Sequence, residues 1–404
     1  METPLISWSG DEQRTADLRS TLPCETMPAM IIASIEIIPV RLPLREPFVV
    51  AYASYPDTLS VLVRIRTRDG AEGWGEATPD PNVTGETWGG TAETLRRDLA
   101  PALIGHDARH REAALNALDA RVEGAPAAKA ALDIALHDLV ARAAGMPLWQ
   151  LLGGRAREAL QISRVISMGE PAAMAAAATR HVGDGFHTVK VKVGDAANPL
   201  LDASRVAAVR QAVGAEIAIK VDVNQGWRSP GTAIAAIRAM APSLPAYIEQ
   251  PVLWWDMEGL AEVRRQTGAI VMIDEGCHGP RDMLRAASLR AADLVNIKLM
   301  KSGGILNALK LNAIAEAAGI PAQVGTMVES SIASAAGLHT AIAMSNVRTV
   351  EMGGPLMLAE DIGDVSAWYR HDMVTVPDSP GLGITVDVDR VRHFSDDWWT
   401  VEAP

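Results

Sequence analysis

The sequence predicts an α/β fold in which a small N-terminal α+β domain precedes a barrel of eight parallel strands. After residue 154, short β-branched runs alternate with helical runs, and strands joined in this way pair in parallel. Before it, two strand-like runs are followed by three helical ones, the order typical of a separate α+β unit. The length of 404 residues suits such a pair of domains.

The composition excludes several classes of protein. Apolar residues make up 48% of the chain, enough for a large core, and the formal net charge is −12. Nucleic acids and anionic membranes both select basic surfaces, so neither is an expected partner. Cys24 and Cys277 form no metal-type pair, which favours a reducing, cytoplasmic location. No apolar run approaches the roughly 20 residues that span a bilayer.

Residues 1–30 are expected to form a flexible extension. They mix charged residues with prolines and lack the apolar stretch of a signal peptide. Met27 and Met30 immediately precede the first strand-like run, which leaves the choice of start site as an alternative explanation. The predicted domains therefore begin at residue 31.

Residues 31–154 are predicted to be the α+β domain. β-branched residues alternate along 33–41 and 59–67, and a turn at Asp69-Gly70 follows, as in an antiparallel strand pair. Alanine and leucine then recur at three- and four-residue spacing, which indicates helices. These predicted helices cover 91–103, 110–122 and 127–144.

Residues 155–372 are predicted to be the barrel, and residues 373–404 a tail of strand and turn character that packs back on the first domain. The eight strands recur about every 25–30 residues, the spacing of successive βα units. The predicted strands are 160–166, 188–193, 217–223, 246–249, 270–274, 294–298, 322–325 and 349–351. The predicted helices are 201–213, 232–240, 257–266, 280–287, 305–318 and 332–344.

Charged residues end the predicted strands, and active sites of barrels lie at these ends. Lys190 and Lys192 alternate with valines, so both point to one face. On an edge strand that face would be solvated, but in a barrel the valines pack against helices and the lysines point inward. Buried ammonium groups need carboxylates nearby. The next three strands end in Asp222, Glu249 and Asp274.

These three carboxylates predict a metal site. Singly, each is better explained as a helix cap or a surface acid, but together they repel one another unless a cation joins them. An oxygen-only set without Cys or His suits Mg²⁺ better than Zn²⁺. Lys298 ends the sixth strand, opposite Lys192 on the second. Two bases facing a metal-bound carboxylate would remove a proton from one face of the adjacent carbon and return one to the other.

Five motifs of the barrel occur in the order in which one enzyme group carries them. They are Lys-Val-Lys at 190–192, Asp-Val-Asn-Gln-Gly-Trp at 222–227, Ile-Glu-Gln-Pro at 248–251, Ile-Asp-Glu at 273–275 and Asn-Ile-Lys-Leu-Met-Lys-Ser-Gly-Gly at 296–304. Over about residues 34–384 the chain resembles the enolase superfamily, in its mandelate racemase/muconate lactonizing enzyme branch. Gly-Trp-Gly-Glu-Ala at 73–77 and Val-Thr-Gly-Glu-Thr at 83–87 are similar to the dipeptide epimerases of that branch.

The resemblance implies a modified TIM-type barrel with an N-terminal α+β capping domain that the C-terminal tail completes. It also implies Mg²⁺ as cofactor, a small-molecule carboxylate as substrate and a homo-oligomer. The metal would stabilise the enediolate formed when the α-proton leaves. The implied roles are Asp222, Glu249 and Asp274 as metal ligands, Lys192 and Lys298 as opposed acid/base groups, and Lys190 as their electrostatic helper.

The eighth strand departs from the pattern of dipeptide epimerases. Those enzymes usually end it with Asp-x-Asp, which holds the substrate ammonium group, whereas this chain has Glu351 and Gly353. The loop 48–55, expected to cover the site, contains no Arg or Lys and so offers no clamp for a second carboxylate. The expected substrate contacts are Glu351, Tyr52, Tyr55, Asn224 and Met327.

These features lead to one principal hypothesis and two alternatives. The principal one is a racemase or epimerase acting on an amino-acid derivative or dipeptide-like carboxylate with a hydrophobic distal group. The first alternative is a muconate-type cycloisomerase or lyase that uses one of the two lysines. The second is a binding protein that kept the barrel without the chemistry. The pair Trp254-Trp255 is expected either to wall the site or to pack between helices.

Overall fold

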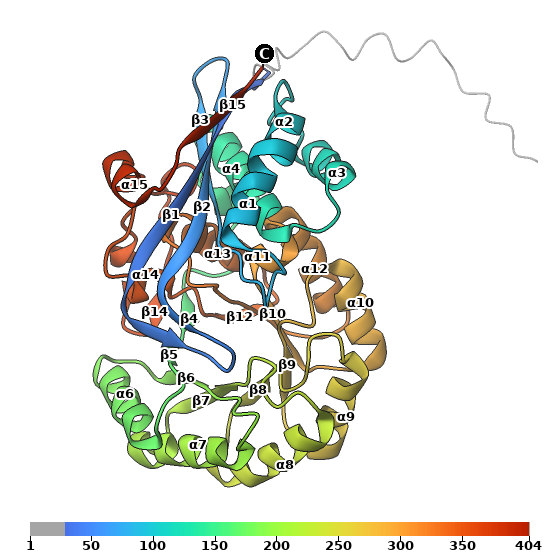
Figure 1. The fold of residues 1–404 in the computed structure, drawn as a ribbon, viewed down its shortest axis with the longest axis vertical. Coiled ribbons are helices and arrows are strands. Elements are labelled where there is room, and N and C mark those ends of the chain that lie inside the picture. Colours follow the sequence, from blue (N-terminus) through green and yellow to red (C-terminus); the bar gives the residue numbers. More distant parts are fainter. Residues whose placement is uncertain (1–28, 404) are drawn as a thin grey trace, which may run out of the picture.

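The computed structural model describes residues 29–403, so the extension expected over residues 1–30 lies almost entirely outside the described part. Two units lie one above the other, a cap built on a sheet and a ring of strands enclosed by helices (Figure 1). The predicted fold class, a barrel with an α+β capping domain completed by the C-terminal tail, is confirmed. None of the helices in residues 29–403 is long and apolar enough to cross a membrane.

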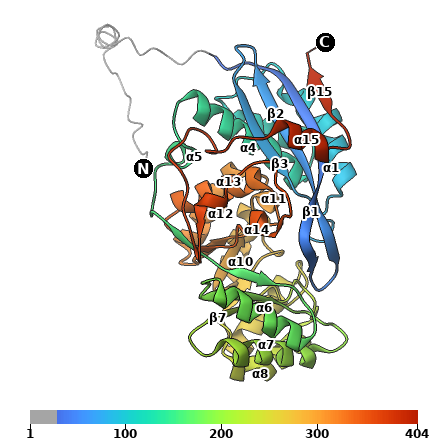
Figure 2. The same ribbon diagram turned by 90° about the vertical axis from the view of Figure 1, so that its left-hand side faces the viewer.

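The cap sheet is antiparallel and has the strand order β15-β1-β2-β3. Pairing of β1 with β2 continues to Val49 and Ser54, so the predicted loop 48–55 is the tip of a long hairpin. The C-terminal strand joins the far edge of this sheet (Figure 2). The strands are β1 (Ile32–Val49), β2 (Ser54–Thr67), β3 (Glu72–Ala77) and β15 (Trp399–Glu402).

Strand β3 was not among the predicted elements because Gly73 and Gly75 interrupt its β-branched pattern. The structure explains both glycines by the close approach of helix α4 (Pro126–Ala143). A Cβ atom at Gly75 would lie 1.9 Å from the carbonyl oxygen of Ala131. The other cap helices are α1 (Trp88–Thr94), the π-helical turn Leu95–Leu99, α2 (Ala100–Leu103), α3 (Arg111–Arg121) and α5 (Leu148–Leu151).

The barrel closes through one stretch of chain that pairs on both sides. Strand β4 pairs with the last barrel strand, β12, and β5 pairs with β6, while only Ser163 separates β4 from β5. Counting β4 and β5 as one strand gives the eight strands that the sequence predicts. The bounds are β4 (Leu160–Ile162), β5 (Arg164–Ile166), β6 (Thr188–Lys192), β7 (Ala218–Asp222), β8 (Tyr247–Glu249), β9 (Val271–Ile273), β10 (Leu294–Ile297), β11 (Ala322–Val324) and β12 (Val347–Val350).

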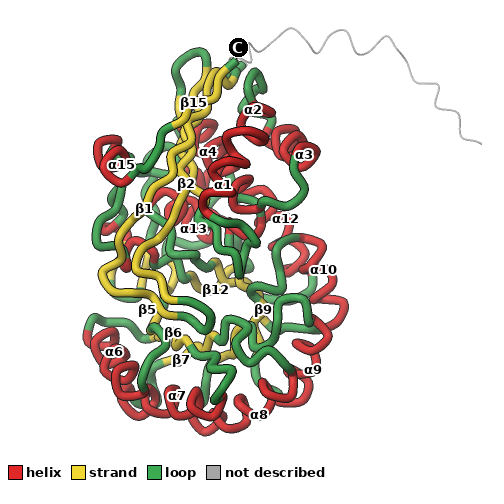
Figure 3. Tube along the Cα trace, viewed as in Figure 1, coloured by secondary structure: helices red, strands yellow, loops and turns green. Residues whose placement is uncertain are grey.

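Helices form the outer layer of the barrel (Figure 3). Helix α6 was missed because only Met174 and Ala178 of its thirteen residues are buried, which leaves a weak apolar pattern. The helices are α6 (Pro171–Gly183), α7 (Pro199–Val213), α8 (Pro230–Met240), the 3₁₀ turn Ala241–Ser243, α9 (Met257–Thr267), α10 (Pro280–Leu289), α11 (Leu299–Ser302), α12 (Ile305–Ala317) and α13 (Ser331–Ala343).

The eighth strand is followed by only a four-residue helix, after which the chain returns to the cap. On the way, β14 pairs antiparallel with β4 and so adds a short hairpin to the barrel. The elements of this segment are α14 (Gly354–Met357), the 3₁₀ turn Ser366–Trp368, β13 (Tyr369–Arg370), β14 (Met373–Val374) and α15 (Val388–Phe394). The exact domain boundaries at residues 154 and 372 stay a prediction.

Carboxylates of the cap hold it on the barrel through helix N-termini. Glu76 of β3 accepts hydrogen bonds from the amides of Ser330 and Ala333, at 2.9 and 3.0 Å, where α13 begins. Asp133 of α4 accepts from the amide of Ile305, where α12 begins. Helix N-termini carry partial positive charge and free N–H groups, so these contacts fix the cap over the strand ends.

Candidate active site

Three buried carboxylates meet at the carboxyl ends of adjacent strands. Asp222 ends β7, Glu249 ends β8, and Asp274 follows β9. One oxygen from each lies within 4.8 Å of the others, and none of the three residues is exposed to solvent. The register pairs Asp222 directly with Glu249, so the closeness is a property of the sheet.

The electrostatics of this cluster fit a cation. Burial and the charge of Asp222 raise the pKa of Glu249 well above its usual value. Burial also opposes ionisation of Asp222, but Lys190 and Lys192 lower the pKa of that carboxyl to about 2. Among the described residues, the close partners of Glu249 Oε2 and of both carboxylate oxygens of Asp274 are lysine ammonium groups at 2.7 to 2.8 Å, and none of these contacts has the geometry of a hydrogen bond. Oxygen-only ligands without Cys or His are suited to a divalent cation such as Mg²⁺.

Lys192 and Lys298 lie on opposite sides of the carboxylates. Lys192 ends β6 and Lys298 directly follows β10, four strand positions away around the ring. Lys192 Nζ lies 2.7 Å from Asp222 Oδ2, and Lys298 Nζ lies 2.8 Å from Asp274 Oδ2. Burial works against the charge of Lys298, but Asp274 and Glu275 raise its pKa above the usual value.

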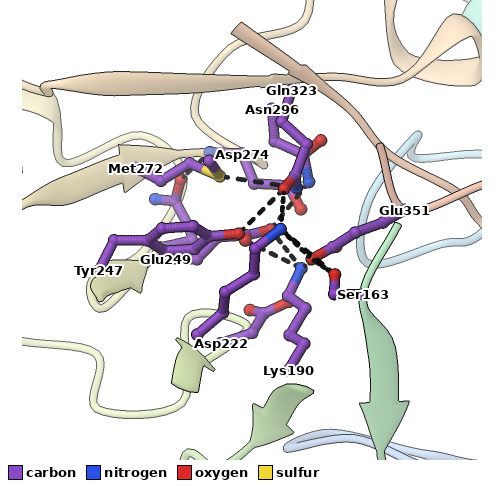
Figure 4. A network of polar contacts seen from close by, with 12 residues as sticks. Ser163, Lys190, Asp222, Tyr247, Glu249, Met272, Asp274, Asn296, Gln323 and Glu351 are labelled. Carbon is purple, nitrogen blue, oxygen red and sulfur yellow. Dashed lines mark hydrogen bonds and ion pairs between the residues drawn. The ribbon is translucent and has the colours of Figure 1, made fainter. Parts of the chain in front are cut away.

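Lys190 lies between the carboxylate cluster and the eighth strand. Its Nζ is 2.9 Å from Asp222 Oδ2, 2.8 Å from Glu249 Oε2 and 2.6 Å from Glu351 Oε2. Figure 4 shows Lys190 and Glu351 pointing toward each other in this network. Burial disfavours the ammonium, yet the three carboxylates hold the pKa of Lys190 well above its usual value.

A cavity of about 330 Å³ lies over the lysines, between the barrel and the cap. Lys190, Lys192 and Lys298 line it, and so do all five residues expected to contact substrate. Its outer part is mostly apolar, whereas the expected pair Trp254-Trp255 does not line it and lies exposed on the surface. The expected contacts are Tyr52, Tyr55, Asn224, Met327 and Glu351, and the apolar lining includes Leu44, Phe48, Val50, Leu59, Trp88 and Met357.

Two residues of this region were not singled out in the sequence. Asp80 follows β3, lines the cavity and accepts a 2.5 Å hydrogen bond from the Tyr55 hydroxyl. Attention to the barrel strand ends alone overlooked it. Lys220, in Lys220-Val221-Asp222, repeats the alternation that revealed Lys190 and Lys192, so the same pattern could have found it.

Comparison with known proteins agrees with this geometry. Residues 32–153 match the family described as mandelate racemase/muconate lactonizing enzyme, N-terminal domain. Residues 173–391 match the family described as enolase C-terminal domain-like. The chain belongs to the mandelate racemase/muconate lactonizing enzyme family. Members of this family in the comparison are racemases, epimerases and cycloisomerases, so the protein is an isomerase of the enolase superfamily.

Relatives within the family cover nearly the whole chain. An N-succinyl-L-Arg/Lys racemase of Bacillus cereus is 42% identical over 91% of this chain and 98% of its own length. The crystal structure of an N-succinyl Arg/Lys racemase from Bacillus cereus matches with a TM-score of 0.90 and covers 92% of this chain and 100% of that one. An L-Ala-D/L-Glu epimerase of Bacillus subtilis is 38% identical over 88% of this chain and 97% of its own. The muconate cycloisomerase 1 of Pseudomonas putida is 34% identical over 91% of this chain and 100% of its own.

The buried carboxyl group of Glu329, behind the cavity loop that contains Met327, is expected to make the stability of the protein depend on pH. Burial raises the pKa of Glu329 to about 7 from the usual 4.5, although Thr326 donates a hydrogen bond to its carboxylate. The folded state binds this proton more tightly than the unfolded state does, so protonation of Glu329 stabilises the fold. This contribution to the free energy of unfolding is fully present below about pH 4.5 and is lost as the pH rises to about 7. The difference corresponds to about 3 kcal/mol.

We expect Glu329→Gln to flatten the fall in the free energy of unfolding between pH 5 and 8. Urea unfolding at several pH values measures this, with the exposed Glu262→Gln as the matched control. An unchanged slope in Glu329→Gln would assign the pH dependence to other groups.

Proposed function

We propose that this enzyme racemises an N-acylated amino acid by moving the α-proton between Lys192 and Lys298. The observation that carries the proposal is the placement of these two lysines on opposite sides of one cavity, beside three buried carboxylates. Mg²⁺ held by Asp222, Glu249 and Asp274 would supply the positive charge that makes the proton next to a carboxylate acidic enough to remove. A solved dipeptide epimerase of Cytophaga hutchinsonii, 32% identical, is described as complexed with Mg.

The lysines divide the proton transfer between them. One starts as the free amine and takes the α-proton, while the other starts as the ammonium and gives its proton to the opposite face of the same carbon. The roles exchange for the other enantiomer. Asn224 Oδ1 accepts a 2.9 Å hydrogen bond from Lys192 and so orients it. The ammonium of Lys190 would lie against the substrate carboxylate and stabilise the charge that develops there.

The eighth strand favours an acylated nitrogen over a free ammonium group. Gly353 provides no carboxylate, and Glu351 already contacts Lys190 and accepts a 3.0 Å hydrogen bond from Ser163. An α-ammonium group would therefore lack an unengaged acid partner at the eighth strand, whereas an amide nitrogen needs none. The relationship to an N-succinyl-L-Arg/Lys racemase supports the same class of substrate.

The outer cavity fits a long side chain with a cationic end. Its walls are apolar, and Asp57 and Asp80 are the acids of its cap side. Asp57 pairs with Arg41 at 2.9 Å, but the described structure gives Asp80 no cationic partner. Apolar walls suit the methylene stem of a lysine-like side chain, and Asp80 suits its ammonium group.

We expect Asp80→Asn to reduce the preference for N-succinyl-lysine over N-succinyl-norleucine by about tenfold in kcat/KM, the effect of about 1.4 kcal/mol. Norleucine has the same stem without the charge, so the ratio isolates the cationic end. Asp57→Asn is the matched control and should leave the ratio near the wild-type value. An unchanged ratio in Asp80→Asn would place recognition of the cation elsewhere.

Proton NMR in deuterium oxide tests the proposed reaction directly. A library of N-acylated amino acids and dipeptides is incubated with enzyme and Mg²⁺, and loss of the α-proton signal is followed. Absence of exchange across the library would reject the proposal. A muconate substrate is less well supported, because the muconate cycloisomerase 1 of Pseudomonas putida is 34% identical to this chain, whereas the N-succinyl-L-Arg/Lys racemase is 42% identical. The expected homo-oligomer and cytoplasmic location stay predictions.

A further inference from the structure

A second layer of polar side chains fills the barrel beneath the carboxylate cluster. Lys220 precedes Asp222 on β7 by two residues, and Tyr247 precedes Glu249 on β8 in the same way, so all four point inward. The register pairs Lys220 with Lys190 on one side and with Tyr247 on the other. Lys220 is only 5% exposed.

Lys220 has one anionic partner among the described residues, Glu351. Its Nζ lies 2.7 Å from Gln323 Oε1, 3.2 Å from Ser163 Oγ and 3.5 Å from Glu351 Oε1. The other oxygen of Glu351 lies 2.6 Å from Lys190 Nζ. Figure 4 shows Glu351 reaching both Ser163 and Lys190. The carboxylate of Glu351 therefore bridges two buried lysines, and Lys220 touches none of the three acids of the cluster.

We propose that Lys220 is a positioning residue that acts through Glu351 to hold the Lys190 ammonium at the level of the substrate carboxylate. With Lys220 present, the charge of Glu351 is shared between two cations. Without it, Lys190 would be the one remaining cation paired with Glu351 among residues 29–403, and it would be drawn more strongly toward Glu351, away from Asp222 and Glu249. The role of Lys190 toward substrate rests on the proposed function; the Lys220–Glu351–Lys190 arrangement does not.

A double-mutant cycle tests this inference. We expect Lys220→Met and Glu351→Gln each to lower kcat/KM for racemisation by about 30-fold or more, because both disturb Lys190. The double variant should be no worse than Glu351→Gln alone, since Lys220 then has nothing to act through. Losses that multiply in the double variant, or a folded Lys220→Met within threefold of wild type, would overturn the proposal.

A readout without substrate separates this inference from the proposed reaction. The ¹⁵N resonance of Lys190 Nζ, assigned with Lys190→Met, should move in Lys220→Met relative to wild type. It should not move when Lys220→Met is added to Glu351→Gln. A Lys190 resonance that ignores Lys220 would overturn the inference even if the enzyme racemises its substrate, whereas absence of exchange by the wild type would reject only the proposed reaction.

Thermal unfolding controls for simple loss of structure. Tyr247→Phe removes the 3.1 Å hydrogen bond to Gln323 in the same layer but removes no hydrogen bond or ion pair of Glu351 or Lys190. It should lower the unfolding temperature and change the Lys190 resonance less than Lys220→Met does. Should Lys220→Met not fold, Lys220→Gln, which keeps a donor for Gln323, goes through the same cycle with the same deciding outcomes.

Discussion

Lys192→Ala is expected to abolish racemisation and to lower α-proton exchange from one enantiomer by about 10³-fold, within the range of positioned acid/base groups. Lys298→Ala is expected to do the same for the opposite enantiomer. Each variant keeps one lysine, and that lysine can still remove the α-proton from its own face and return a deuteron to the same face. The measurement is deuterium incorporation from D₂O into each pure enantiomer, followed by NMR and by chiral analysis.

Loss of exchange with one enantiomer in Lys192→Ala and with the opposite enantiomer in Lys298→Ala distinguishes a two-base racemase from its alternatives. A cycloisomerase or lyase that uses one lysine as base would lose exchange with both enantiomers in one variant and little in the other. A binding protein would exchange neither enantiomer even as wild type. Lys310→Ala is the matched control, because Lys310 lies on the surface of α12 and pairs with Glu112 of the cap at 2.6 Å, away from the cavity.

The sequence predicted the barrel well because its regularity is local. Each βα unit shows its own change of period, and the alternation of Lys190 and Lys192 with valines requires a strand with one inward polar face. The succession of predicted strands placed Asp222 and Glu249 on neighbouring strand ends, where the structure brings them together. Parallel pairing places the carboxyl ends of all strands at the same face of the barrel, and so it brings the residues at these ends together.

Parts determined by contacts distant in sequence could not be predicted in the same way. β3 looks unlike a strand because its glycines serve the approach of α4, which is more than fifty residues away. The barrel closes at Ser163 by pairing on both sides, a feature visible only in three dimensions. Asp80 reaches the cavity from the cap, so its nearness to the barrel lysines follows from the packing of two domains.

In the candidate site, buried lysines and buried carboxylates balance one another's charge, and this balance can be seen only when the residues are considered together. Lys190 and Lys192 contact Asp222, while Lys298 and Lys301 contact Asp274, with Lys301 Nζ at 2.7 Å from Asp274 Oδ1. Burial works against the ammonium form, but the carboxylates raise the pKa of Lys190 and Lys298 above the usual value of a lysine. A base must be an amine, so a cation that neutralises the carboxylates would also release a lysine for proton removal. The proposed metal ligands and the proposed bases would therefore act as one electrostatic unit.

Glu249→Gln is expected to remove measurable Mg²⁺ binding at millimolar concentration and to lower racemisation by about 10³-fold or more, because it takes one anionic ligand from a hard cation. Calorimetric titration measures the binding. In the wild type, Mg²⁺ at 100 times its Kd should add about 2.7 kcal/mol to the free energy of unfolding, and in the variant it should add nothing. Glu258→Gln, on the exposed face of α9, is the control and should bind Mg²⁺ normally. A Glu249→Gln enzyme that still racemises its substrate in the presence of a chelator would contradict the metal site.

The same substitution has an opposite effect on the metal-free protein. Burial and Asp222 raise the pKa of Glu249, so the folded state opposes its ionisation, and above the usual pKa range of a glutamate this costs stability. Glutamine carries no charge, and its Oε1 can still accept the 2.9 Å hydrogen bond from Asn296. Thermal unfolding at pH 8 with a chelator should therefore show Glu249→Gln to be more stable than wild type, and a less stable variant would mean that the ion pair with Lys190 outweighs the repulsion. A more stable variant would show that the three carboxylates repel one another in the metal-free protein. Such a repelling cluster is expected at a site whose function is to bind a cation.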